Sequence, residues 1–216
     1  MKVLHGRLTR ELSRAELDGL LAGHRRVVLD AGAGDGRLAY RRAAADPAAF
    51  VIALDPVKEN MEKIAVRAAR KPARGGLDNL VLVWATLESA APELEAVATD
   101  VHVVLPWGSL LRGLVERSRS ILGPLRRVAQ PGASIDVVLN AEPWNRSVPA
   151  GLHDLPAVDL TLARETLAPA YREHGIEITE TGVLSPKEVG ALDSSWSRRL
   201  AHGHHPAFVY LRGRAR

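Results

Sequence analysis

The 216-residue chain contains no cysteine. Without a thiol it has no disulfide framework, no thiolate nucleophile and no cysteine-based zinc site, and this favours a reducing compartment. The sequence also lacks an N-terminal signal-peptide pattern and any apolar run of about 18 residues, the length that spans a membrane. We therefore expect a cytoplasmic protein without a membrane partner.

Aromatic residues are also scarce, with four Trp, three Tyr and two Phe. Trp107 stands in an unexpected place, because it directly follows an expected strand at 100–105 in the run Leu-Pro-Trp-Gly. An exposed Trp is costly, so its ring either packs from the far side or carries a stacked ligand. Trp84, inside another expected strand, is predicted to be a core residue.

Positive charge is in mild excess, with 29 Lys and Arg against 25 Asp and Glu. Residues 58–74 hold six Lys and Arg against two Glu, and residues 196–216 hold five Arg, three His and no acid. Such a segment is usually a solvated face, but beside a ligand site it favours a polyanionic partner. The histidines at 202–205 have no cysteine or acid alongside, so no metal site is predicted.

Apolar runs and helical patterns alternate along the chain, which predicts an α/β fold. Seven strands are expected, at 25–30, 50–55, 79–85, 100–105, 133–140, 176–184 and 207–213. Helices are expected at 13–21, 56–71, 109–129 and 160–175, the first opened by a capping box at Ser13 and Glu16. Because the early strands are apolar throughout, we expect a mostly parallel sheet with helices on both faces, plus a short N-terminal hairpin.

No repeat or linker divides the sequence, so we expect one domain over residues 1–216. Within it, residues 1–24 form an N-terminal extension. Residues 141–158, which are Pro-rich and weakly periodic, form an irregular insertion.

The turn at 29–36, Leu-Asp-Ala-Gly-Ala-Gly-Asp-Gly, ends a strand and opens a helix. Gly32, Gly34 and Gly36 let the backbone turn sharply and a ligand approach closely. Asp30 precedes the turn, and Asp55 ends the next strand, where an acid accepts ribose hydroxyls. The spacing differs from the dinucleotide pattern G-x-G-x-x-G. A purely structural turn and a dinucleotide site stay open as alternatives.

This combination of acid, alternate glycines and second acid resembles the class I S-adenosylmethionine-dependent methyltransferases, which have a Rossmann-like fold. The resemblance implies S-adenosylmethionine as cofactor and S-adenosylhomocysteine as product. It also implies an adenine edge after the third strand, where Thr86, Leu87 and Glu88 are the candidates. Ordinary loop packing, or for Glu88 a helix N-terminal acid, is the alternative.

Class I enzymes that methylate exocyclic amines often carry an Asn/Asp-Pro-Pro-aromatic motif after strand four. Leu105-Pro106-Trp107-Gly108 keeps Pro and the ring but lacks the polar residue that orients an amine. A ring nitrogen needs less such help, because it needs only a base held flat and out of its stack. Methylation then leaves the base cationic, which a Trp face stabilises, and no general base is expected.

A second Trp stands in the run Leu-Asp-Ser-Ser-Trp-Ser-Arg-Arg-Leu-Ala at 192–201. If residues 185–206 fold over the site, Trp196 faces Trp107 and the two rings sandwich a base. The alternative is that Trp196 belongs to the core of a terminal helix.

Five runs together resemble the aminoglycoside-resistance 16S rRNA methyltransferases of the kanamycin–apramycin (Kam) family. They begin at Leu29, Ala53, Lys71, Leu105 and Ser194, and read LDAGAGDGR, ALDPVKENMEKI, KPARGGLDNL, LPWGSLLRG and SSWSRRLA. The resemblance runs over nearly the whole chain. It implies methylation of N1 of adenine 1408 in the decoding site of the 30S subunit, by an enzyme that acts as a monomer.

The resemblance also implies roles for individual residues. The cofactor is expected to contact Asp30, Gly32, Gly34, Asp55, Pro56, Thr86, Leu87, Ser109 and Ser194. Catalysis is expected to use Trp107 and Trp196 as stacking platforms, with Glu88 nearby. Binding of rRNA is expected to use Arg67, Arg70, Lys71, Arg74 and Arg199.

Two other functions stay open. A small-molecule methyltransferase is disfavoured by the basic segment at 58–74, and a non-catalytic binding protein is disfavoured by the intact glycine turn and both acids. One departure from the family is the segment His202-Gly203-His204-His205, where relatives carry several Arg or Lys. Since histidine is mostly neutral at pH 7, it predicts a lower rRNA affinity.

Overall fold

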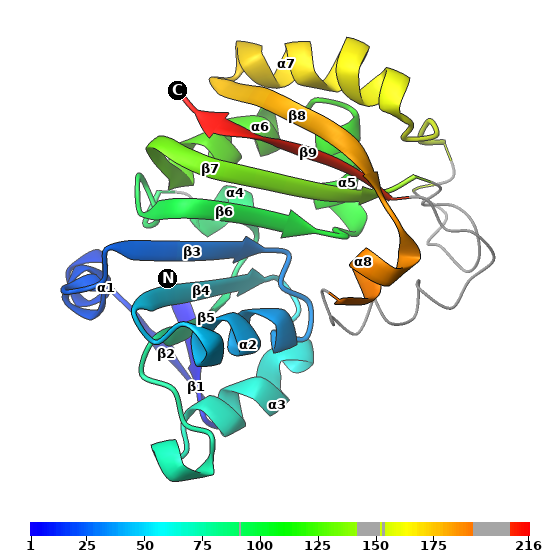
Figure 1. The fold of residues 1–216 in the computed structure, drawn as a ribbon. Coiled ribbons are helices and arrows are strands. Elements are labelled where there is room, and N and C mark those ends of the chain that lie inside the picture. The colour runs from blue at the N-terminus through cyan, green and yellow to red at the C-terminus, as the bar shows by residue number, and fades with distance from the viewer. Residues whose placement is uncertain (91, 142–151, 153, 192–207) are drawn as a thin grey trace.

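A nine-stranded sheet forms the centre of the computed structural model, which describes residues 1–90, 92–141, 152, 154–191 and 208–216. The strand order is β2-β1-β5-β4-β3-β6-β7-β9-β8. The strands are β1 (Lys2–His5), β2 (Leu8–Glu11), β3 (Arg26–Ala31), β4 (Ala49–Asp55), β5 (Leu80–Trp84), β6 (Ala98–Val104), β7 (Ala129–Asn140), β8 (Ile176–Leu184) and β9 (Phe208–Ala215). Figure 1 shows them side by side.

The five strands from β5 to β7 run parallel, and β9 and β8 complete the predicted set of seven with antiparallel pairing. This mostly parallel α/β sheet confirms the predicted fold class. The N-terminal hairpin is not separate from the sheet, because β1 pairs antiparallel with β5 and extends the sheet to nine strands.

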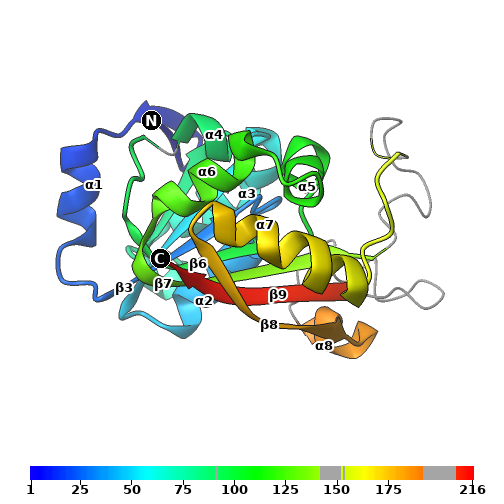
Figure 2. The same cartoon turned by 90° about the horizontal axis from the view of Figure 1, so that it is seen from above.

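Helices cover the sheet unequally on its two faces. They are α1 (Arg14–Leu21), α2 (Arg37–Ala45), α3 (Lys58–Ala68), α4 (Leu87–Ala90), α5 (Gly108–Val115), α6 (Arg119–Val128), α7 (Ala168–Glu173) and α8 (Pro186–Ala191). Figure 2 shows α4 to α7 on one side of the sheet and α2 and α8 on the other. Apolar residues of α2 and α3, such as Ala39 and Met61, pack on Val51 and Ala53 of β4.

Two helices depart from the expected ranges. The range 109–129 is divided between α5 and α6 by Arg117, whose φ is +61°. The two helices then meet closely, since a Cβ on Gly113 would lie 2.2 Å from Ile121. The range 160–175 begins with a π-helical segment, η3 (Leu162–Leu167), before α7. Pro169 lacks an N–H and crowds the carbonyl one turn earlier, which accounts for the wider turn.

Other local predictions are confirmed. Ser13 and Glu16 form the capping box of α1, with Ser13 N donating to the Glu16 carboxylate at 2.7 Å. The described ends of the 141–158 insertion meet where Val158 N donates to the Ala141 carbonyl at 2.9 Å. Residues 142–151 and 153 of this insertion lie outside the described residues. Within the described part of the chain, no helix combines the length and hydrophobicity needed to span a bilayer.

Candidate active site

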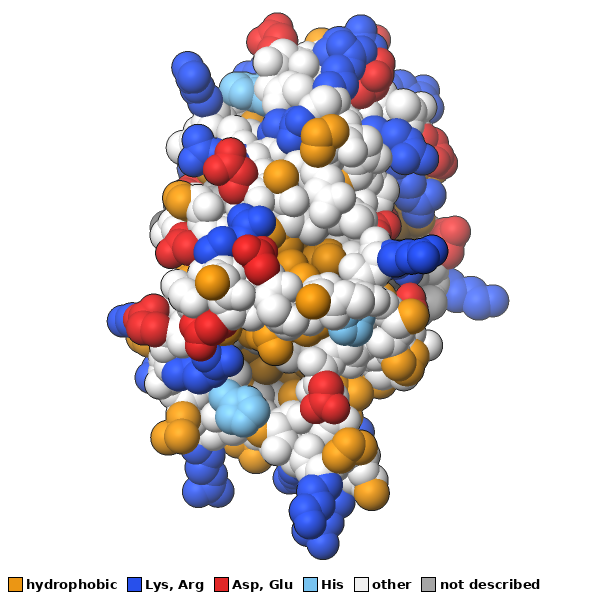
Figure 3. Space-filling view, turned by 90° about the vertical axis from the view of Figure 1, so that its left-hand side faces the viewer, with side chains coloured by type: hydrophobic (Ala, Val, Ile, Leu, Met, Phe, Trp, Pro, Cys, Tyr) orange, Lys and Arg blue, Asp and Glu red, His pale blue; other side chains and the backbone are white. Residues whose placement is uncertain are grey.

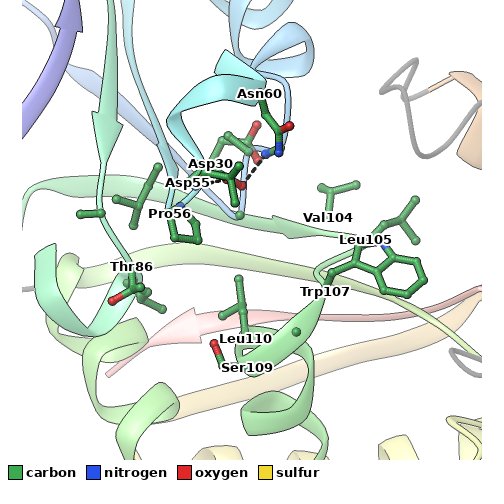
Figure 4. Close-up of a pocket in the computed structure, with 18 of the residues that line it drawn as sticks. Asp30, Asp55, Pro56, Asn60, Thr86, Val104, Leu105, Trp107, Ser109 and Leu110 are labelled. Carbon is green, nitrogen blue, oxygen red and sulfur yellow. Dashed lines mark hydrogen bonds between the residues drawn. The ribbon is translucent and has the colours of Figure 1, made fainter. Parts of the chain in front are cut away.

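The glycine turn after β3 is fastened to the end of β4. Gly32 N and Ala33 N donate to the Leu54 carbonyl at 2.8 and 2.9 Å. Gly34 N donates to Asp55 Oδ2 at 2.8 Å, and Val57 N donates to Asp55 Oδ1 at 2.9 Å. Asp55 therefore fixes both the glycine turn and the start of α3, so the two sequence motifs form one unit (Figure 4).

A cavity of about 350 Å³ opens at the carboxyl ends of the parallel strands. Ten of the predicted site residues line it, namely Asp30, Gly32, Gly34, Asp55, Pro56, Thr86, Leu87, Glu88, Trp107 and Ser109. Figure 4 shows Thr86 and Trp107 at opposite ends, with Pro56 and Leu110 between them. The carboxyl edge of β3, β4, β5 and β6 is where open α/β sheets bind ligands.

Asp30 brings a buried negative charge to the cavity wall. Its side chain is 2% exposed, and Oδ2 has no hydrogen-bond partner among the described residues. Arg42 of α2 lies 3.8 Å from Oδ1. Burial raises the pKa of Asp30, while the charges of Arg42 and His102 oppose that rise. A carboxylate oxygen that lacks a donor at the wall of a cavity fits a cationic amine.

Asp55 is buried beside the same cavity. Burial raises its pKa most, the two backbone N–H donors lower it, and the neighbouring Asp30 raises it further. Each carboxylate oxygen accepts one backbone hydrogen bond and keeps a second lone pair, which suits a pair of ribose hydroxyls. A Cβ on Gly34 would meet no atom within 4 Å, so this part of the turn faces open space, and its φ of +58° favours glycine.

The end of the cavity at β5 is formed by a capped helix start. Thr86 and Ser89 bond reciprocally, with Thr86 N donating to Ser89 Oγ at 3.1 Å and Ser89 N donating to Thr86 Oγ1 at 3.2 Å. This pair holds the first turn of α4, where Leu87 is buried and Glu88 is half-buried. The cap places Thr86, Leu87 and Glu88 together on the wall.

The exit of β6 is the strained part of the site. Leu105 is buried, has a φ of +51° and donates its N–H to the Val138 carbonyl at 2.8 Å. A left-handed φ is costly for a bulky residue, and such strain gathers at functional sites. Gly108, at φ +59°, completes the turn. Trp107 is half-buried on the core, and its ring projects at the Leu105 end of the cavity (Figure 4).

Three predicted site residues lie outside the described residues: Ser194, Trp196 and Arg199. The segment 185–206 that contains them begins with α8. Val189 of α8 packs with Leu105, Val138 and Phe208, which places α8 beside the exit of β6. The sandwich of Trp107 and Trp196 stays a prediction.

The basic segment after α3 forms a tight turn that α2 anchors. It contains a 3-10 turn, η1 (Pro72–Arg74), followed by Gly75 at φ +84° and Gly76. Gly76 has no room for a side chain, because a Cβ would lie 1.7 Å from the Arg70 carbonyl. The Tyr40 hydroxyl of α2 donates to the Gly75 carbonyl at 2.7 Å, and Arg67 lies over the Tyr40 ring at 4.5 Å.

The predicted cations of this segment, Arg67, Arg70, Lys71 and Arg74, are all exposed. In Figure 1 the segment that follows α3 forms the lower end of the molecule. In Figure 3, Lys and Arg side chains project from this lower end. Acidic and basic side chains are interspersed over much of the remaining face. Arg67 lies on α3 itself and the other three cations follow it in sequence, while Asn60 in the first turn of α3 lines the cavity.

Sequence reasoning missed Asn60 and Leu110, which also line the cavity. Asn60 lies in the first turn of α3, three residues after Val57, to whose carbonyl its N–H bonds at 3.1 Å. A polar residue one turn after the strand-ending acid was a signal available in the sequence.

Trp84 is half-buried rather than a core residue, because the ammonium groups of Lys2 and Lys58 lie over its ring, each 5.1 Å from the centroid.

Fold and site together define a class I S-adenosylmethionine-dependent methyltransferase. The family model of NpmA, the 16S rRNA (adenine(1408)-N(1))-methyltransferase, matches residues 2–215. The chain belongs to this family.

Relatives and solved structures agree over the full length. The chain is 45% identical over 212 residues to a 16S rRNA (adenine(1408)-N(1))-methyltransferase of Streptoalloteichus tenebrarius, covering 98% of this chain and 96% of the relative. The crystal structure of the 16S rRNA methyltransferase KamB matches with a TM-score of 0.91 at 40% identity, covering 100% of this chain and 99% of that one. A mutant of the Catenulisporales acidiphilia 16S rRNA (adenine(1408)-N(1))-methyltransferase, crystallised with the cosubstrate SAM, matches with a TM-score of 0.91 at 36% identity, covering 100% and 96%.

Proposed function

We propose that this protein transfers a methyl group from S-adenosylmethionine to N1 of adenine 1408 of 16S rRNA, within the 30S subunit. The single observation that carries this proposal is the position of Trp107, at the end of the cavity away from Thr86 (Figure 4). The expected biological outcome is aminoglycoside resistance, by a cytoplasmic enzyme that acts as a monomer.

The residues at the cavity fit the cofactor. When bound, S-adenosylmethionine supplies an electrophilic methyl group on a sulfonium centre. Asp30 is placed to hold a cationic amine and Asp55 to accept ribose hydroxyls, while Thr86 and Leu87 border the adenine end. The turn from Gly32 to Gly34, with Pro56 and Ser109, forms the walls between.

Trp107 then provides a flat aromatic face at the Leu105 end of the cavity, where the methyl group of the cofactor is expected. A flipped adenine loses its stacking partners, and an aromatic face replaces about 1–3 kcal/mol per base. N1 of adenine carries its own lone pair and no proton, so none of the protein's side chains removes a proton in the transfer. The product base is cationic, and the indole face stabilises that charge as the reaction proceeds.

Leu105 supports this choice of acceptor. In its position a polar side chain would orient an exocyclic amine, but Leu105 is buried among Val138, Val189 and Phe208 and offers no hydrogen bond from its side chain. A ring nitrogen is therefore the better acceptor at this strand exit. Glu88, half-buried beside Thr86 and Leu87 on the cavity wall, is expected to contribute to binding the cofactor or the base.

Docking on rRNA is proposed to use Arg67, Arg70, Lys71 and Arg74, with Arg199 anchoring the flipped nucleotide. Phosphate contacts of this kind position a protein without reading sequence, and they weaken as salt rises. A surface that recognises folded rRNA rather than a linear sequence would suit an assembled 30S subunit as substrate.

The decisive experiment incubates the protein with S-adenosylmethionine labelled in its methyl group and intact 30S subunits. Primer extension then maps the modified nucleotide, since methylation at N1 blocks base pairing. The expected result is one stop at adenine 1408, dependent on the cofactor. A parallel incubation replaces the 30S subunits with a metabolite extract. Label in that extract, with none in 16S rRNA, would show a small-molecule methyltransferase and overturn the proposal.

A further inference from the structure

A second hollow lies between the N-terminal hairpin and α3, outside the cofactor cavity. It has a volume of about 580 Å³. One wall is formed by the hairpin, including Arg7 in the β1–β2 turn and Leu8 at the start of β2. The other wall is formed by Lys58 and Lys63 of α3 and by Arg70, which follows the helix. We refer to this hollow as the hairpin groove.

Contacts at both ends of the hairpin groove fix the spacing between its two walls. The tip of the hairpin rests on the end of α3, because a Cβ on Gly6 would lie 3.7 Å from the Ala69 Cβ. At the other end, the ammonium groups of Lys2 on β1 and Lys58 on α3 both lie 5.1 Å from the centroid of the Trp84 ring. The ring attracts both cations and so joins the two walls.

Charge in the hairpin groove is strongly one-sided. Arg7, Lys58, Lys63 and Arg70 line it against a single acid, Glu62. Among the described residues, none of these four cations forms an ion pair with a carboxylate within 4.0 Å. Elsewhere in the described chain arginines commonly do pair, as Arg26 does with Asp100 at 3.1 Å. Cations that are held together in excess over a single acid, and without an ion pair to it, attract a polyanion.

The groove is continuous with the proposed rRNA-docking surface. Arg70 lines the groove and also precedes the turn that presents Lys71 and Arg74. Leu8 is 72% exposed at the rim, an apolar side chain that a sugar or base face would cover. A sugar–phosphate backbone has this combination of dense negative charge and short apolar faces.

We propose that the hairpin groove receives a backbone segment of 16S rRNA, with Arg7 contacting it from the hairpin side and Lys58 and Lys63 from α3. This rests on the proposed function and adds the N-terminal hairpin to the docking surface. The groove lies apart from the methyl-transfer cavity, so its contacts position the rRNA and do not take part in the reaction.

The first test measures affinity for intact 30S subunits over a series of KCl concentrations. Arg7→Gln/Lys63→Gln removes two groove charges, and Arg119→Gln/Arg127→Gln is the matched control, because both arginines are exposed on α6 on the other side of the sheet. Losing two phosphate contacts should lower the slope of log affinity against log salt by about 1.5–2 and weaken binding at low salt by about tenfold. The control should match the wild type.

The design separates the two proposals. Wild-type methylation of adenine 1408 with a groove variant that matches the control in affinity and slope would overturn the groove and leave the function standing. Absence of wild-type methylation would overturn the function, and the groove with it. A normal melting temperature of the groove variant, together with unchanged cofactor affinity, keeps any loss of binding assignable to the groove.

The second test uses the absence of cysteine. Leu8→Cys gives the chain a single thiol at the rim of the groove, to which a photo-cross-linker attaches. Irradiation on the 30S subunit should cross-link 16S rRNA, and the cross-link should fade as salt rises. A cross-link to a ribosomal protein instead, or none while methylation proceeds, would contradict an rRNA backbone in the groove.

Discussion

The Arg42 guanidinium lies 3.8 Å from the Asp30 carboxylate, too far for a hydrogen bond but close enough to favour its charge. Asp30 also lies directly opposite His102 in the pairing of β3 with β6, and His102 lies opposite Asp136 of β7. The wall of the cavity thus holds a carboxylate whose charge is offset by neighbours that do not hydrogen-bond to it. This costs stability and leaves an oxygen for a ligand.

Replacing that carboxylate should separate stability from function. Burial raises the pKa of Asp30 above its ordinary 3.8. The contribution of the neutral carboxyl group to the free energy of unfolding is therefore fully present below pH 3.8, and it is lost as pH rises through the folded-state pKa. Asp30→Asn should therefore raise the free energy of unfolding by about 1 kcal/mol at neutral pH and by less near pH 4. Urea denaturation over this pH range measures it.

The same variant should bind S-adenosylmethionine about ten- to hundredfold more weakly, as calorimetry will show, since a charged hydrogen bond is lost. Asp78→Asn, in the exposed loop before β5, is the control and should change neither property. A fall in stability for Asp30→Asn would mean that Arg42 and His102 outweigh the cost of burial.

Trp107 should matter for transfer and little for the cofactor. Trp107→Ala should lower kcat/KM on 30S subunits about ten- to hundredfold through lost stacking, with cofactor affinity changed less than about threefold. Trp107→Phe should keep most of the activity, because it keeps an aromatic face. Steady-state methylation and calorimetry give the two readouts. An alanine variant with normal kcat/KM would refute the stacking role.

Leu105 allows the strain at the β6 exit to be measured. Both Leu105→Ala and Leu105→Gly remove a buried side chain, which should cost about 2–4 kcal/mol of unfolding free energy. Glycine adopts φ +51° without penalty, whereas alanine pays about 1 kcal/mol. We expect the glycine variant to be the more stable by that amount in urea denaturation. The reverse order would show that the exit relaxes when the leucine is removed.

Gly76 should control docking without touching the cavity. Its Cβ would collide with the Arg70 carbonyl at 1.7 Å, so Gly76→Ala must displace the turn that carries Lys71 and Arg74. Affinity for 30S subunits should fall at least about tenfold, with cofactor affinity unchanged. Gly19→Ala is the control, since a Cβ there meets nothing within 4 Å and helix α1 gains a better helix former. Equal 30S affinities of the two variants would contradict the role of the turn.

Much of this architecture was predictable because its signals are local. The apolar run from Phe50 to Asp55 and the glycine turn after Asp30 fix strand, turn and cavity edge, and both acids line the cavity as expected. Trp84 was mispredicted because the two cations that occupy its ring come from β1 and α3, distant in sequence. The break at Arg117 likewise depends on the packing of α5 against α6, which periodicity does not encode.

Tyr40 has a consequence for how the acceptor nucleotide is chosen. It lies four residues after Gly36, in the helix that opens at the glycine turn, and its hydroxyl holds the Gly75 carbonyl of the basic turn. One rigid turn of α2 therefore sets the spacing between the turn proposed to grip the rRNA backbone and the cavity proposed to hold the methyl donor. With that arrangement, the protein would select its target adenine by the distance of that adenine from the bound rRNA backbone. The identity of the flanking nucleotides would not decide the choice.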